Sequence, residues 1–84
     1  MEDFEARLNV TYGGANGDLP DPIPFDTTDT VVRRIVQEAI RTGGIPGINA
    51  DQAADLTDFV VDRFGPNEAR PTSLIQLRQK TPFG

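Results

Sequence analysis

The sequence predicts an α+β fold in which a single helix packs on a mixed sheet, with the element order β-β-α-β-β. A stretch near the start alternates apolar and polar residues, as a strand with one buried face does. A central stretch places apolar residues at helical spacing. Two apolar, β-branched stretches then follow, each bounded by glycine or proline. With 84 residues, the chain has room for one domain.

The first strand is expected from Phe4 to Tyr12, where every second residue is apolar. Gly13 to Asp18 contains an Asn-Gly pair and should form the hairpin turn, because these residues accept positive φ values. A second strand is expected from Leu19 to Phe25. Three prolines in this stretch remove hydrogen-bond donors, so it can only be an edge strand or an extended arm.

A helix of about fifteen residues is expected to begin within Asp26–Thr30, where several side chains can cap its first turn. Gly43 and Gly44 should end it as a left-handed cap, and Pro46 prevents its continuation. One side of the helix should face the core and the other should face water. The apolar side comprises Val31, Val32, Ile35, Val36, Ala39 and Ile40, and the polar side comprises Arg33, Arg34, Gln37, Glu38 and Arg41.

A loop from Ile45 to Thr57 should follow, in which Ile45 and Ile48 pack against the core and Asp51 to Asp55 form one helical turn. The next strand is expected from Phe59 to Phe64, which is aromatic and β-branched. Gly65, Pro66 and Asn67 interrupt it. The last strand is expected from Ser73 to Arg78.

Composition argues against an enzyme and against a cofactor. The chain has no cysteine and no histidine, which excludes disulfides, thiolate metal sites and histidine acid-base catalysis. Two pairs of acids, Asp18 with Asp21 and Asp51 with Asp55, lack the ligand spacing of a calcium loop. The glycines at 13, 14 and 17 lack the following helix and lysine of a phosphate-binding loop. We therefore expect loop acids, a hairpin turn, no metal and no catalysis.

Charge and hydropathy limit the partners. A net charge of -5 disfavours nucleic acid, because binding to phosphates requires clustered Lys and Arg. No apolar run is long enough to span a bilayer. Met1-Glu2-Asp3 is acidic where a secretory signal would be basic. The sequence thus predicts a cytoplasmic protein that binds other proteins, with no nucleic-acid or membrane partner.

If the two terminal strands lie side by side as a parallel central pair, the helix can pack across the sheet in a β-grasp. Another small α+β roll with the same elements stays open. Several segments resemble the ubiquitin family in the same order. Asp29-Thr30-Val31 is similar to the family's Asp-Thr-Ile at the helix start, Gly44-Ile45-Pro46 to its Gly-Ile-Pro, and Thr72 to Arg78 to its last strand. The resemblance covers nearly the whole chain.

Three features depart from the ubiquitin family. The segment from Gly65 to Thr72 is shorter, so the family's short fourth strand should be reduced or missing. The chain ends in Phe83-Gly84 and not in two glycines. The loop between the helix and the next strand is longer than in ubiquitin, and in this it resembles divergent bacterial ubiquitin-like proteins.

The resemblance implies a ubiquitin-like β-grasp domain over residues 1–78 and a flexible C-terminal tail over 79–84. It implies a protein modifier of a bacterial ubiquitin-like conjugation system, attached to targets through the carboxylate of Gly84. Thr81, Pro82 and Phe83 would thread into the partner enzymes. The implied partners are activating and conjugating enzymes, a deconjugating metalloprotease and target proteins, and the modifier is expected to be a monomer.

A second hypothesis is a non-covalent β-grasp interaction module, or a small subunit of a larger complex, in which the terminal glycine is incidental. Sulfur carriage on a terminal thiocarboxylate is disfavoured by the missing double glycine. Tyr12, Phe59 and Phe64 are expected in the core. Val60 and Leu74 face away from their apolar neighbours, so they are the candidate partner-binding surface on the outer sheet face.

Overall fold

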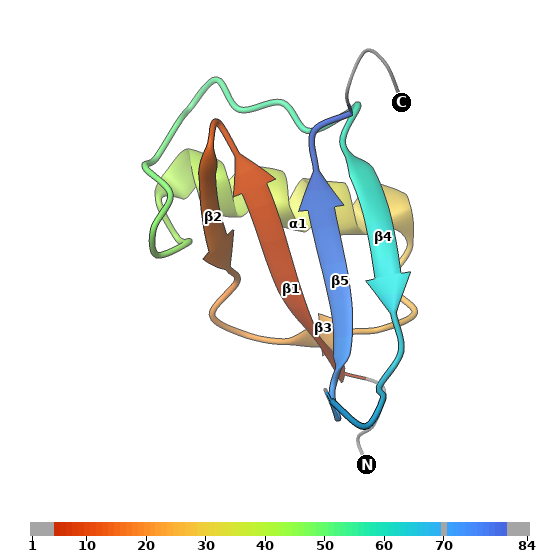
Figure 1. Cartoon of the computed structure of the whole chain (residues 1–84). Helices are drawn as coiled ribbons and strands as arrows, with labels where there is room; N and C mark the ends of the chain where they lie inside the picture. The colour runs from red at the N-terminus through yellow and green to blue at the C-terminus, as the bar shows by residue number, and fades with distance from the viewer. Residues whose placement is uncertain (1–4, 70, 81–84) are drawn as a thin grey trace.

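The computed structural model describes residues 5–69 and 71–80. It contains strands β1 (Glu5–Tyr12), β2 (Ala15–Asp18) and β3 (Ile23–Pro24), helix α1 (Asp29–Thr42), and strands β4 (Val60–Phe64) and β5 (Ser73–Arg78). The strands form one mixed sheet in the order β2-β1-β5-β4, and β3 also pairs with β1. Figure 1 shows α1 crossing one face of this sheet. The predicted α+β class, with one helix on a mixed sheet, is confirmed.

The centre of the sheet is a parallel pair formed by the two ends of the chain. β1 and β5 are aligned from Ala6 opposite Ser73 to Val10 opposite Leu77, and their arrows point the same way in Figure 1. β4 runs antiparallel to β5. A parallel pair requires a long crossover, which here comprises β2, β3, α1, β4 and the loops between them.

The hairpin turn is shorter than the sequence predicted. Gly13 and Gly14 have φ values of 58° and 85°, and Tyr12 lies opposite Ala15. Positive φ at both central residues is typical of a two-residue type I′ turn. The prediction that the turn extends to Asp18 is therefore wrong: Gly13-Gly14 already reverses the chain, and the Asn-Gly pair that follows belongs to β2.

The predicted second strand, Leu19 to Phe25, is a strand only at Ile23–Pro24, and β2 precedes it within the predicted turn, so three strands precede the helix instead of two. Asn9 lies opposite Asp18 and Ala6 lies opposite Ile23, which leaves the four residues 19–22 opposite two residues of β1. This is a bulge with two extra residues. Because side chains alternate with a period of two, two extra residues leave the following side chains on the same faces of the sheet as before. Ile23 is therefore still on the inner face, where it is buried.

Helix α1 has the predicted caps. The Thr28 side chain accepts from the backbone N–H of Val31, and Gly43 ends the helix in the left-handed conformation. Val31 itself is 36% exposed and Ile35 is only half-buried, so the buried stripe is narrower than predicted. The core combines the inner face of the sheet, α1 and the loops. Its buried members are Ala6, Leu8, Val10, Ile23, Val32, Val36, Ile40, Ile45, Ile48, Ala54, Leu56, Phe59, Ile75 and Leu77.

One polar side of α1 binds the loop that leads to β4, although the sequence placed it toward water. Arg33 Nε donates to the carbonyl of Phe59 over 2.9 Å. Gln37 Oε1 accepts from the N–H of Leu56 over 2.9 Å, and Arg41 Nε donates to the carbonyl of Ala54 over 2.9 Å. These half-buried side chains satisfy backbone groups of residues 54–59. Residues 51–55 form a turn and not the predicted helical turn.

Candidate interaction surface

No group of acidic residues in the described part of the chain is arranged to hold a metal ion. Within the same residues, no helix is both long and apolar enough to cross a bilayer. The candidate site that the sequence predicted is a surface, namely the face of the sheet turned away from α1. We call it the outer face. Its side chains are Arg7, Asn9, Thr11, Asn16, Asp18, Val60, Asp62, Phe64, Leu74, Gln76 and Arg78, by their register.

A polar network occupies the middle of the outer face. Asn9 is only 9% exposed, and its Nδ2 donates to Asn16 Oδ1 over 2.9 Å and to Asp18 Oδ1 over 2.7 Å. Its Oδ1 accepts from Gln76 Nε2 over 3.1 Å. A buried amide is tolerated when its donors and acceptors are paired. Asn9 thus connects β2, β1 and β5 and fixes their register.

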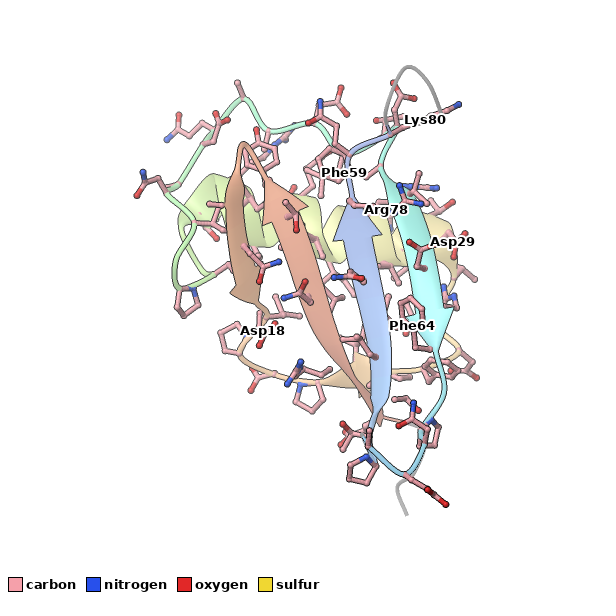
Figure 2. All side chains as sticks on the ribbon, in the orientation of Figure 1. Asp18, Asp29, Phe59, Phe64, Arg78 and Lys80 are labelled. Carbon is pink, nitrogen blue, oxygen red and sulfur yellow. The ribbon has the colours of Figure 1, made fainter. Side chains whose placement is uncertain are left out.

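An apolar pair lies beside this network. Phe64 and Leu74 are directly opposite each other on β4 and β5. Phe64 is 41% exposed, and Figure 2 shows it at the end of β4. The prediction that Phe64 belongs to the core is wrong, because the strand alternation turns Val61 and Arg63 inward and Phe64 outward.

The two residues predicted as a binding surface do lie on the outer face, each half-buried, but the structure does not bring them together. Val60 is opposite Arg78, whereas Leu74 is opposite Phe64. Four strand positions separate the two pairs, which corresponds to about 13 Å. The apolar partner of Leu74 is Phe64, which sequence reasoning missed. The sequence did contain a sign of this. Phe64 lies an even number of residues from Val60, so both side chains must point to the same face of the strand.

Arg63 takes the inward position that an apolar residue would fill. Its guanidinium donates to the carbonyl of Phe25 over 2.6 Å and to the carbonyl of Thr27, and it pairs with Asp29 Oδ1 over 2.6 Å. This contact fastens β4 to the segment that enters α1. The charge of Arg63 is therefore held beneath the sheet and is not available on the outer face.

Tyr12 and Asp51 join the end of β1 to the long loop. The Tyr12 hydroxyl donates to Asp51 Oδ2 over 2.6 Å, and its ring stacks on Phe59 with centroids 6.0 Å apart. The hydrogen bond from Tyr12 lowers the pKa of Asp51, aided by the N–H of Ala53, and raises the pKa of Tyr12. Asp51 serves the fold here, and Tyr12 is half-buried against the core, as predicted.

A groove of about 990 Å³ lies where β1 and β5 begin. Its walls include five prolines, Pro20, Pro22, Pro46, Pro66 and Pro71, and its charged residues are Glu5, Arg7 and Asp18. Arg7 and Asp18 form a long ion pair of 3.8 Å. The groove therefore has apolar walls and no set of reactive side chains.

The predicted tail site falls beyond the part of the chain that can be described. Thr81, Pro82, Phe83 and Gly84 lie outside the described residues. β5 ends at Arg78, and Gln79 and Lys80 after it are exposed.

Comparison of the chain with protein-family models, with curated proteins and with solved structures found no match.

Proposed function

We propose that this chain is a ubiquitin-like β-grasp protein that acts as a protein modifier, attached to target proteins through Gly84 in a bacterial ubiquitin-like conjugation system. One observation carries the proposal: the last strand, β5, lies in the centre of the sheet, parallel to β1, with α1 across one face. This arrangement agrees with the resemblance to the ubiquitin family in the helix start, the helix end and the last strand.

The proposed chemistry needs only a carboxylate that partner enzymes can bind. The Gly84 carboxylate would attack the α-phosphorus of ATP and release pyrophosphate. A thiol of the activating enzyme would then attack the acyl carbon and release AMP. After transfer to a thiol of the conjugating enzyme, a nucleophile of the target would attack the acyl carbon and release that thiol. Six residues separate Gly84 from the end of β5, a span of at most about 20 Å, which suffices to enter a cleft. The outer face would provide the contact with these enzymes.

A second candidate is a non-covalent interaction module, and the pair formed by the exposed Phe64 and the half-buried Leu74 favours it. Aromatic and aliphatic side chains exposed side by side are frequent at protein interfaces. In this case the same outer face would bind the partner, and Gly84 would have no chemical role.

The test is to incubate the full chain with ATP, magnesium and the activating and conjugating enzymes encoded beside its gene, and to search for covalent adducts by mass spectrometry. We expect an adduct whose linkage peptide ends in Gly84. A variant that lacks Gly84 should give none, whereas Asp21→Asn, an exposed change far from the tail, should react like wild type. If enzymes of demonstrated activity give no adduct, or the shortened variant gives the same products, the modifier hypothesis fails and the non-covalent module is retained.

A further inference from the structure

The two edges of the sheet are protected very differently. An edge strand presents unpaired N–H and C=O groups that can pair with another chain, and proteins usually block it with proline, bulges, lysine or covering loops. In the part of the chain that the structure describes, the β2–β3 side carries prolines, a bulge and a packed loop, whereas β4 carries no proline and no bulge. Figure 1 shows β4 as the outermost strand on its side of the sheet.

The β2–β3 edge is blocked in two ways. The bulge at residues 19–22 contains Pro20 and Pro22, and β3 contains Pro24, so three N–H donors are missing there. The chain after α1 also packs closely on β2. A Cβ placed on Gly47 of this loop would lie only 3.2 Å from the backbone carbonyl of Asn16 in β2.

Among the described residues the β4 edge lacks proline, lysine and a bulge, and its one protective feature is the inward-pointing charge of Arg63. β4 has the sequence Val-Val-Asp-Arg-Phe, without proline, glycine or lysine, and it pairs with β5 alone. Both of its charged side chains are paired within the chain. Asp62 bonds Arg78 of β5 over 2.9 Å, and Arg63 bonds the segment before α1. Asp62 lies on the outer face and remains partly exposed, so a strand added to β4 would meet its charge.

Apolar side chains remain accessible beside this edge. The exposed large hydrophobic residues of the described chain are Phe64 and Val31. Phe64 is the last residue of β4. Its neighbour Leu74, opposite it on β5, is half-buried. A strand added to β4 could thus cover apolar groups in addition to forming backbone hydrogen bonds.

A second copy of this chain does not fit the edge well. Antiparallel self-pairing that uses all five residues of β4 places Asp62 opposite Asp62 of the other copy, and like charges directly opposite are destabilising. Each copy also carries a net charge of -5. A segment with a basic residue opposite Asp62 and apolar residues opposite Val60 and Phe64 matches both the charge and the side-chain pattern.

We propose that β4 binds an extended segment of a partner protein by strand addition, with alternating apolar and basic side chains on the outer face. Main-chain hydrogen bonds would give affinity, and the alternate side chains would give selectivity. This interaction does not depend on attachment through Gly84, because it would use the edge of the sheet and not the C-terminal tail of the chain.

The test uses the full chain labelled with ¹⁵N and a short synthetic peptide, Val-Thr-Lys-Thr-Val, which as a strand places valine, lysine and valine on one face. Hydrogen exchange of the backbone amides is followed by NMR. In β4, alternate amides pair with β5 and the others point to the free edge. We expect the peptide to slow exchange of the edge-pointing amides by about tenfold and to leave the β2–β3 edge unchanged.

Matched variants test the charge pattern. Asp62→Asn should weaken binding of the lysine peptide about two- to fivefold, and a peptide with glutamate in place of lysine should bind wild type more weakly. Asp21→Asn makes the same change of charge on the opposite edge and should have no effect. Absence of peptide binding, or protection confined to β2–β3, would overturn the proposal. Concentration-dependent protection of β4 without peptide would identify a second copy as the occupant and would overturn it as well.

Discussion

At Gly17, β2 and the loop after α1 lie close together. A Cβ at this position would lie 2.6 Å from the Pro46 carbonyl and 2.8 Å from Ile45 Cγ2. The sequence suggested that Gly17 serves a turn, but the structure requires it for space. Its role therefore depends on residues nearly thirty positions away in the chain.

We predict that Gly17→Ala destabilises the fold by about 1–3 kcal/mol, because backbone must move to admit the methyl group. Gly65→Ala is the matched control, since a Cβ at Gly65 meets no atom within 4 Å. Urea denaturation of both variants measures the difference. Equal stability of the two variants would show that the contact between β2 and the loop is not tight.

The contact between Tyr12 and Asp51 should make stability depend on pH. The pKa of Asp51 is lowered, chiefly by the Tyr12 hydroxyl, so its contribution is present above the unfolded pKa of about 4 and is lost as the pH falls through the folded value. The pKa of Tyr12 is raised, chiefly by the same bond. Its contribution is thus present below about pH 10 and is lost as the pH rises through the folded value.

We predict that Tyr12→Phe is less stable than wild type between about pH 4 and pH 10, and that the difference shrinks in stronger acid. Urea denaturation over a pH series gives the comparison. Asp51→Asn should reduce the acid dependence in the same way. A difference between Tyr12→Phe and wild type that stays constant from neutral pH into strong acid would contradict this account.

At the scale of elements, helix α1 makes tertiary contacts along two of its sides. Val32, Val36 and Ile40 pack on the sheet, while Arg33, Gln37 and Arg41 bind the loop before β4. The second set recurs at intervals of four residues, as the first does, and so lies along one side of the helix. The loop of residues 54–59 has no strand partner, and these side chains satisfy its backbone instead.

We predict that Gln37→Ala costs about 1–2 kcal/mol of unfolding free energy, because it leaves the N–H of the buried Leu56 without its acceptor. Glu38→Ala, on the exposed side of the same helix turn, should change stability by less than about 0.5 kcal/mol. Thermal or urea unfolding of the two variants measures the loss of stability in each. If the two substitutions cost the same, the helix does not hold the loop through Gln37.

For the whole molecule, the central pairing of β1 with β5 explains both the core and the candidate surfaces. The inner faces of the two strands supply Leu8, Val10, Ile75 and Leu77, which are fully buried. Their outer faces carry the network around Asn9. Placing the chain's two ends in the centre moves β2 and β4 to the edges, and the contrast between these edges underlies the proposed strand addition.

The sequence by itself determined the elements whose signals are local. The caps of α1 and the bounds of β5 were predicted closely, because a capping threonine, a left-handed glycine and an alternating strand act on their own neighbours. The outward position of Leu74 followed from the same alternation. These signals need no knowledge of distant residues.

The tertiary structure alone decided which segments pair and which face of the sheet or helix each side chain occupies. It moved the hairpin turn to Gly13-Gly14, turned Phe64 outward against Leu74, and brought Gln37 to the backbone of Leu56. In each case two local conformations were acceptable, and a contact with a residue far along the chain selected one. Burial, register and close approach depend on such partners, so the candidate surface and the open edge became visible only in the folded chain.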